Sequence, residues 1–114
     1  MDYAKLQELN RFLWQSYEKA ITPDAESPLA FTLRVRAERD ASALVDRLKA
    51  QGCEILWLKS SRWPFGRRWE IAAKTPEPIR HSLEAIDQWG KGLLTVIRGS
   101  DAVLQHWVPL EPDA

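Results

Sequence analysis

The chain has little cysteine and little histidine, and this scarcity argues against several classes of protein. Its 114 residues include one cysteine, Cys53, and two histidines, His81 and His106, which lie far apart in the sequence. A single thiol cannot form an internal disulfide, so a reducing compartment such as the cytoplasm is favoured. Zinc sites normally need three or four protein ligands. We therefore expect no metal, and we expect the Cys53 thiol to be an inert, apolar side chain.

Net charge and long apolar runs are lacking as well. Sixteen Lys and Arg residues balance sixteen Asp and Glu residues, whereas a protein that holds nucleic acid by bulk charge is usually basic. No apolar run approaches the ~20 residues of a membrane-spanning helix. The N-terminus has no basic segment followed by an apolar one, as a signal peptide would have. We expect no membrane contact, and contact with nucleic acid only through a local basic patch.

Motifs of catalysis and of phosphate binding are missing. "GKG" at 90–92 lacks the glycine and Ser/Thr pattern of a phosphate-binding loop and follows a helix rather than a strand. "RRWEIAAK" at 67–74 has one aromatic residue and no glycine, unlike the third strand of an RNA-recognition motif. The sequence shows no pattern typical of an active site, so we expect a protein that is not an enzyme and uses no cofactor.

The residues that are present suit one domain with an aromatic core. Hydrophobic residues make up 45% of the chain, charged residues make up 28%, and there are six Trp. The first two values are typical of a globular protein, and the Trp content is high. An indole combines a large apolar area with an N–H that needs a partner. We therefore expect several Trp side chains to be half-buried, at the rim of the core or at an interface.

Residues 1–21 predict an N-terminal amphipathic helix, and residues 22–28 predict a linker. Apolar residues at spacings of three and four give the helix one buried stripe, and Asp2 is placed to cap its start. This stripe consists of Leu6, Leu9, Leu13 and Tyr17. The linker, "TPDAESP", ends the pattern with two prolines. The helix is predicted either to dock on the main fold, over the free face of a sheet, or to meet a partner.

Residues 29–110 predict an α+β domain, and residues 111–114 predict a loose tail. The run 29–37 alternates apolar and polar residues, as a half-buried strand does. Further strands are expected at 53–60, which is apolar on both faces at its centre, at 69–74, and near the C-terminus. With two helices between them, the order is strand, helix, strand, strand, helix, strand. This is the ferredoxin-like βαββαβ order, with an antiparallel sheet and two helices on one face.

The first of these two helices is expected within the segment 39–52, with Asp40 as its N-cap and Gly52 in the left-handed position that follows its last turn. The second is expected to begin at Thr75, with Pro76 at its first position. Where the second helix ends is ambiguous. Gly90 and Gly92, followed by the β-branched Thr95, Val96 and Ile97, favour a break and a hairpin that adds a fifth C-terminal strand. The alternative is a helix that continues to Ile97 and stops at Gly99, because positions 79, 83, 86, 90, 93 and 97 keep a helical rhythm. It would leave one final strand at 102–108. We favour the break.

The stretch "KSSRWPFGRRW", residues 59–69, is the candidate binding site. Residues 54–74 include five basic and two acidic side chains, and Pro-Phe-Gly favours a turn at the tip of a hairpin. Guanidinium groups bind carboxylates or phosphates in a bidentate way, and Trp, Phe and Arg are frequent anchors of interfaces. The candidate contact residues are Arg62, Trp63, Phe65, Arg67, Arg68 and Trp69. The competing interpretation is an ordinary solvated turn, with Trp63 or Phe65 folded back over the sheet edge.

Residues 30–108 also show a family-like layout. A strand "AFTLRV" precedes a helix that ends at "LKAQGCEI", and a variable loop leads to a strand that opens with Trp69. A Pro-started helix follows, and Trp107 lies near the end, in "LQHW". In this layout the chain resembles the family of regulator of ribonuclease activity B, ferredoxin-like proteins that inhibit ribonuclease E and end in Tyr-Asp-Gly-Trp. The resemblance implies a ferredoxin-like fold and a role by protein contact, without catalysis.

Three functions follow as hypotheses. The favoured one is a regulatory domain that binds another macromolecule through the hairpin 59–69, with a protein partner preferred to RNA and a ribonuclease as one target. A homodimer formed head to tail is also allowed, because residues 1–29 carry five acidic and three basic side chains and so oppose the basic hairpin in charge. The alternatives are a small-molecule sensor, with the ligand between the sheet and the N-terminal helix, and an immunity-type protein that occludes a toxin.

Overall fold

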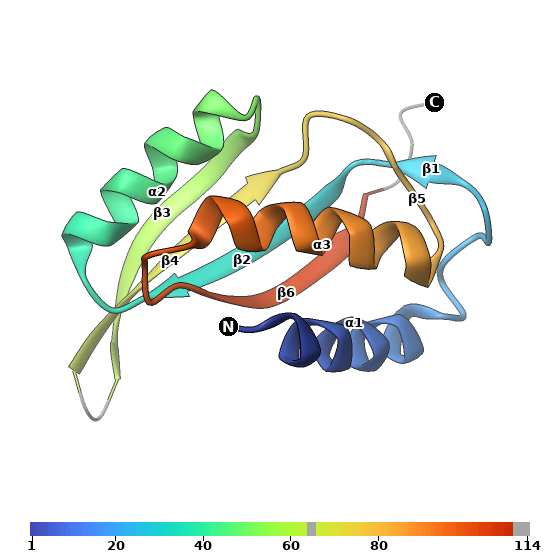
Figure 1. Cartoon of the computed structure of the whole chain (residues 1–114), viewed down its shortest axis with the longest axis horizontal. Coiled ribbons are helices and arrows are strands. Elements are labelled where there is room, and N and C mark those ends of the chain that lie inside the picture. Colours follow the sequence, from blue (N-terminus) through green and yellow to red (C-terminus); the bar gives the residue numbers. More distant parts are fainter. Residues whose placement is uncertain (64–65, 111–114) are drawn as a thin grey trace.

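The chain folds into a layer of helices packed on a layer of antiparallel strands (Figure 1). This computed structural model describes residues 1–63 and 66–110, without the side chains of residues 61–63. The expected turn at residues 64–65 and the expected tail at 111–114 lie outside the described residues. The helices are α1 (Tyr3–Tyr17), α2 (Glu38–Ala50) and α3 (Leu83–Ile97), and the strands are β1 (Glu26–Ser27), β2 (Leu29–Val35), β3 (Glu54–Trp63), β4 (Gly66–Lys74), β5 (Ile79–Arg80) and β6 (Val103–Pro109). The predicted α+β class is confirmed. In the described residues, no helix is long and apolar enough to cross a bilayer.

The main sheet has four strands in the order β3-β4-β2-β6, and every neighbouring pair is antiparallel. This arrangement is compatible with the expected ferredoxin-like layout. The two-residue strands β1 and β5 form a separate ladder, which places part of the expected linker 22–28 in a sheet. Its register pairs Glu26 with Arg80 and Ser27 with Ile79. Nothing in so short a pattern distinguishes it from a loop at the level of sequence.

Strand β2 supplies the centre of the core. Its burial alternates strictly along Leu29–Val35, and the four side chains that face the helices are at most 1% exposed. They are Leu29, Phe31, Leu33 and Val35. Phe31 lies opposite Ala73 of β4 and opposite Trp107 of β6, so both neighbouring strands add to the same core. The half-buried strand predicted at 29–37 is therefore confirmed, two residues shorter than expected.

Helix α2 forms where it was expected, although its start is capped differently. The N-cap is Ala37, which makes no side-chain hydrogen bond, so the predicted Asp40 cap is wrong. Asp40 lies in the first turn with Glu38, where a negative charge favours the N-terminal end of the helix dipole. Gly52 has the positive φ, 87°, that was predicted for the residue beyond the helix end.

Helix α3 begins later than its sequence suggests. The N-cap is Ser82, whose hydroxyl accepts a 3.1 Å hydrogen bond from the Ala85 amide, so the predicted start at Thr75 and Pro76 is wrong. The Thr75 hydroxyl instead accepts a 3.0 Å bond from the Leu29 amide and donates a 3.0 Å bond to the carbonyl of Glu77. This side chain is buried, and it joins the end of β4 to the start of β2 rather than capping a helix.

The predicted break at Gly90–Gly92 is also wrong, and so is the fifth C-terminal strand. Helix α3 continues to Ile97, Gly99 follows with φ 85°, and β6 is the one strand described after it. The alternative reading, with a helix to Ile97 and one final strand, is the correct one. The buried stripe of α3 consists of Ile86, Gly90, Leu93 and Ile97. Gly90 serves close helix packing, since a Cβ built on it would lie 2.6 Å from Cδ2 of Leu6 in α1.

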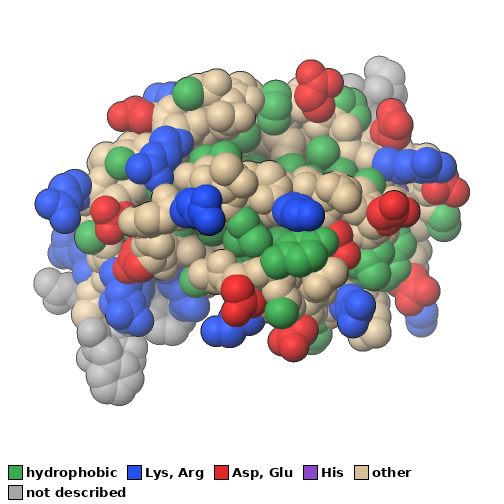
Figure 2. Space-filling view, viewed as in Figure 1, with side chains coloured by type: hydrophobic (Ala, Val, Ile, Leu, Met, Phe, Trp, Pro, Cys, Tyr) green, Lys and Arg blue, Asp and Glu red, His purple; other side chains and the backbone are tan. Residues whose placement is uncertain are grey.

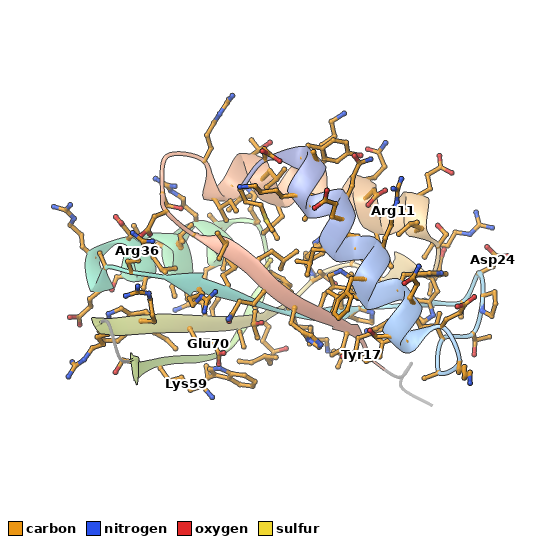
Figure 3. The ribbon with its side chains drawn as sticks, turned by 90° about the horizontal axis from the view of Figure 1, so that it is seen from below. Arg11, Tyr17, Asp24, Arg36, Lys59 and Glu70 are labelled. Atoms are coloured by element: carbon orange, nitrogen blue, oxygen red, sulfur yellow. The ribbon has the colours of Figure 1, made fainter. Side chains whose placement is uncertain are left out.

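Helix α1 docks against α3 and β6, and Asp2 caps it as predicted, accepting a 2.8 Å bond from the Lys5 amide. Its buried residues are Leu6, Asn10 and Leu13. Figures 1 and 3 show α1 beside α3 and across the edge of β6. The expectation that α1 would cover the free face of the sheet is not met. We call this face, turned away from α2 and α3, the open face.

Candidate binding site

Strands β3 and β4 form the predicted hairpin, and it extends past the rest of the sheet (Figure 1). The last rung between β2 and β4 pairs Val35 with Trp69. Beyond it, β3 and β4 pair only with each other, through Ser61↔Arg68, Arg62↔Arg67 and Trp63↔Gly66. We call the described residues 61–63 and 66–68 the arm. Because no third strand pairs with the arm in the described residues, the outer edges of both of its strands lack a strand partner.

The structure separates the six predicted site residues into three groups. Arg67 and Arg68 lie on the arm, the former exposed and the latter half-buried. Arg62 and Trp63 form the last two rungs with their backbones, but their side chains lie outside the described part, as does Phe65 entirely. Trp69 lies at the base of the arm, half-buried and packed against the core.

The charges of the arm are not compensated within the described residues. Neither Arg67 nor Arg68 forms an ion pair there; Arg68 only donates a 3.2 Å hydrogen bond to the Arg67 carbonyl. At the base, the carboxylate of Glu70 accepts from Lys59 at 3.3 Å and is thereby neutralised locally. Figure 2 shows Lys and Arg side chains gathered where the arm leaves the body. The arm therefore presents a net positive charge.

Trp57 lies beside the arm and was not among the predicted site residues. Its indole Nε1 donates a 2.8 Å hydrogen bond to Oε2 of Glu70, and the Lys59 ammonium lies 5.1 Å from the ring centroid. The residue is nevertheless 44% exposed. Figure 3 shows Lys59 and Glu70 side by side near the open face. We call Trp57, Lys59 and Glu70 the indole cluster; it holds an exposed aromatic ring in a fixed orientation beside the arm.

Little in the sequence predicts the indole cluster. Residues 53–60 have apolar side chains on both faces, which is typical of a strand inside a sheet. Strand β3 is instead a terminal strand, so Leu56, Trp57 and Leu58 are 41%, 44% and 40% exposed. The one available signal was Lys59, because a lysine beside an apolar run is typical of an edge strand.

A cavity of about 480 Å³ lies where the end of α1 meets the end of β6. Its lining includes Tyr17, Ile21, Thr22, His81 and Val108. The His81 ring is buried and engaged, with Nε2 2.6 Å from the Ser27 hydroxyl and Nδ1 3.3 Å from the Thr22 carbonyl oxygen. The Tyr17 hydroxyl is hydrogen-bonded to Nε2 of His106. A ligand here would meet mainly apolar surface.

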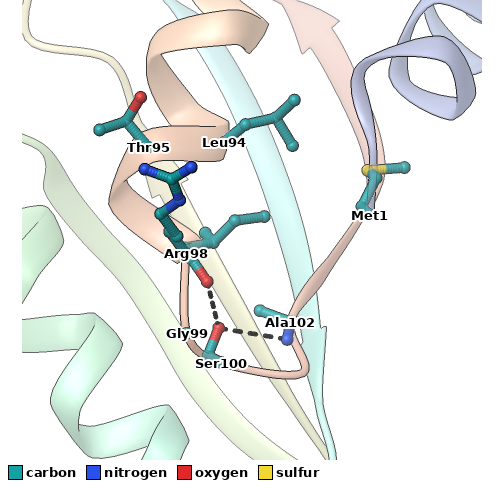
Figure 4. Close-up of a pocket in the computed structure, with 8 residues that line it drawn as sticks. Met1, Leu94, Thr95, Arg98, Gly99, Ser100 and Ala102 are labelled. Carbon is teal, nitrogen blue, oxygen red and sulfur yellow. Dashed lines mark hydrogen bonds between the residues drawn. The ribbon is translucent and has the colours of Figure 1, made fainter.

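Two further cavities lie at other places in the fold. One, of about 390 Å³, lies between Met1 and the turn after α3 (Figure 4). The Ser100 hydroxyl in it already donates to the Ile97 carbonyl at 2.6 Å and accepts from the Ala102 amide at 3.3 Å. The other, of about 300 Å³, lies between α2 and α3 and is lined mainly by apolar side chains, together with Gln51, Gln88 and Cys53. Burial raises the pKa of the Cys53 thiol, which keeps it protonated and of low reactivity at neutral pH.

Comparison with known proteins adds no assignment. No protein-family model matches the chain, and no curated protein matches its sequence. Among residues 1–63 and 66–110, no three His, Cys, Asp or Glu side chains gather in a way that could hold a metal ion. The arm and the indole cluster beside it are therefore the features that bear on function.

Proposed function

We propose that the chain is a non-enzymatic binding domain of ferredoxin-like topology that contacts an acidic protein surface through its arm. Arg67 and Arg68 would pair with carboxylates of the partner, and the Trp57 ring would pack against an apolar side chain of the partner. The resemblance of residues 30–108 to ribonuclease inhibitors makes a ribonuclease the first partner to test.

The observation that supports this proposal is the uncompensated charge of the arm. Arg67 and Arg68 make no ion pair with any described acidic side chain, although Glu70 lies two residues from Arg68. Glu70 is occupied by Lys59 and Trp57 instead. Free guanidinium groups on a projecting hairpin attract an acidic partner and raise its association rate. Arg and Trp are also the residue types that most often dominate binding energy at interfaces.

A protein partner fits the site better than RNA does. The chain as a whole has no net charge, so it lacks the general attraction for phosphate that nucleic-acid-binding domains have. Single-stranded RNA stacks on free aromatic faces. The Trp57 ring carries the Lys59 ammonium 5.1 Å from its centroid and a carboxylate at its N–H, which leaves less room for a base.

The test is capture of partners from cell extract with the double variant Arg67→Glu, Arg68→Glu. We expect it to lose partners that the wild type retains, by about tenfold or more, because two attractive contacts become repulsive. The matched control is Arg11→Glu, Lys19→Glu, which makes the same charge change at exposed positions of α1 and just after it. Treatment with nuclease before capture separates protein from RNA contacts. If the arm variant captures the same partners as the wild type at equal thermal stability, the assignment is wrong.

A second candidate function, a small-molecule sensor, is favoured by the cavity of about 480 Å³ beside α1. It lies between the N-terminal helix and the last strand of the sheet, where the sequence hypothesis placed a ligand. A ligand that binds the native state alone raises the melting temperature. Screening metabolites by thermal shift on the wild type tests this function, and the arm variant above should respond equally because Arg67 and Arg68 lie outside the cavity lining.

A further inference from the structure

Strand β3 pairs with β4 on one side, and its other, outer edge has no strand partner in the described residues. It spans ten residues and lies at one end of the order β3-β4-β2-β6. Its outer N–H and C=O groups can pair with another strand, and proteins usually guard such an edge with charge, proline or a covering segment. Here three consecutive apolar residues, Leu56, Trp57 and Leu58, are each at least 40% exposed. They supply apolar surface on both faces of the edge.

The charges that flank this apolar segment are complementary to each other. Glu54 precedes it and Lys59 follows it, and both are exposed. Their partners in β4 are Lys74 and Glu70, four residues apart, so Glu54 and Lys59 point to the same face of the sheet. In a regular strand, two residues five positions apart, such as Glu54 and Lys59, point to opposite faces. The β-bulge between Ile55 and Trp57 adds the residue that brings the two charges onto one face.

We propose that β3 pairs antiparallel with β3 of a second copy of this chain. The two-fold axis passes between the two strands, at the point midway between residues 56 and 57. This register sets Glu54 of each copy opposite Lys59 of the other, on one face, and Ile55 opposite Leu58, on the other face. Directly opposite residues of antiparallel strands share a face, so the pairing needs the bulge. A two-fold contact that uses the same patch twice is the commonest form of association between identical chains.

This inference goes beyond the proposed function and does not depend on it. In the register above, residues 54–59 pair with residues 54–59 of the second copy. The arm begins after Lys59, at Ser61, and extends past the paired segment. A dimer of this kind would carry two arms that remain free to meet acidic partners. The charge of the chain adds no obstacle, since two neutral copies do not repel each other at long range.

The experiment measures the mass of the protein in solution by sedimentation equilibrium over a wide range of concentrations. The wild type should dimerise reversibly. Glu54→Lys places lysine opposite lysine at both of the symmetry-related contacts, and Lys59→Glu places glutamate opposite glutamate at both, so each variant alone should weaken the dimer on the order of tenfold to a hundredfold. An equimolar mixture of the two variants should recover the wild-type affinity, because lysine then faces glutamate at both places.

The mixture is decisive because Lys59 also pairs with Glu70 inside the chain. Lys59→Glu loses this internal ion pair as well, and mixing the two variants does not restore it. Recovery of the affinity in the mixture would therefore come from the contact between copies alone. The controls are Glu8→Lys in α1 and Lys19→Glu just after it, both exposed and away from β3; they should dimerise like the wild type. Three results overturn the proposal: a wild type that stays monomeric, which leaves the edge to a strand of another protein; variants that dimerise like the wild type; or a mixture that stays as weak as its components.

Discussion

The indole Nε1 of Trp107 donates a 2.8 Å hydrogen bond to Oδ1 of Asn10, and both side chains are fully buried. The Nδ2 group of the same amide donates a 2.8 Å bond to Oδ1 of Asp87. One asparagine in α1 thus joins β6 and α3. A buried polar group with a full set of partners fixes one packing arrangement, because every shifted arrangement leaves a donor or acceptor unpaired.

Replacing Asn10 with leucine should therefore destabilise the fold although it adds an apolar side chain. The Trp107 N–H would remain buried without a partner, which costs about 1–3 kcal/mol in the free energy of unfolding. Urea denaturation measures the change. The matched control is Gln15→Leu, an exposed position on the same helix, which should stay within about 0.5 kcal/mol of the wild type. Equal stability of the Asn10 variant and the control would show that the amide does not hold α1 in place.

Two glycines in α3 should respond in opposite directions to the same substitution. Alanine normally stabilises a helix interior by about 0.5–1 kcal/mol relative to glycine. A Cβ at Gly92 would have no heavy atom within 4 Å, so Gly92→Ala should show this gain. A Cβ at Gly90 would lie 2.6 Å from the buried Leu6 side chain, so Gly90→Ala should lose about 1–3 kcal/mol through overpacking.

Each glycine variant is the control for the other, since both make the same change in the same helix. Thermal and urea denaturation give the comparison, and circular dichroism checks the helix content. If both substitutions stabilise the protein equally, then α1 does not approach α3 as closely as the structure shows.

Cys53 should show a pH dependence in both reactivity and stability. Burial raises the pKa of its thiol above the ordinary value of 9.0. The native state then holds the thiol proton more tightly than the unfolded state, so this stability is present below pH 9.0 and is lost as the pH rises through the folded-state pKa. The thiolate is the reactive species. Alkylation by iodoacetamide at neutral pH should be slower in the native protein than in urea, and a native rate that equals the unfolded rate would contradict the assignment.

Local sequence patterns correctly predicted the elements whose conformation depends mainly on their own residues. The alternation along Leu29–Val35 requires only a period of two, and the structure reproduces it. Asp2 and Gly52 act through short-range geometry, and both were predicted correctly. The hairpin β3–β4 also follows from its turn chemistry and the two strands beside it. The α+β class could therefore be predicted from patterns that involve only residues close together in the sequence.

The errors arose where a distant segment decides the outcome. Gly90 looked like a helix breaker, and it is a contact point for Leu6, which lies in another helix. The β-branched Thr95, Val96 and Ile97 looked like a strand, yet the burial of Leu93 and Ile97 keeps them helical, since tertiary packing outweighs propensity. The start of α3 moved to Ser82 because the preceding residues pair with β1 instead.

The candidate site was predicted only in part for a related reason. The basic character of the arm is a property of the sequence itself. The exposure of Trp57 depends on the position of β3 in the sheet order, and strand order is set by pairings such as that between β2 and β6, which join distant parts of the chain. A period of two tells which side chains share a face, but it does not tell which strand lies outermost.

The position of α1 has a consequence for how large an assembly this chain can form. The four-stranded sheet has two borders, and α1 rests against the one formed by β6. In the dimer proposed above, the two outer borders would be the two β6 strands, and each has α1 packed against it. The helix would then limit the assembly to two copies and oppose its growth into an open-ended polymer.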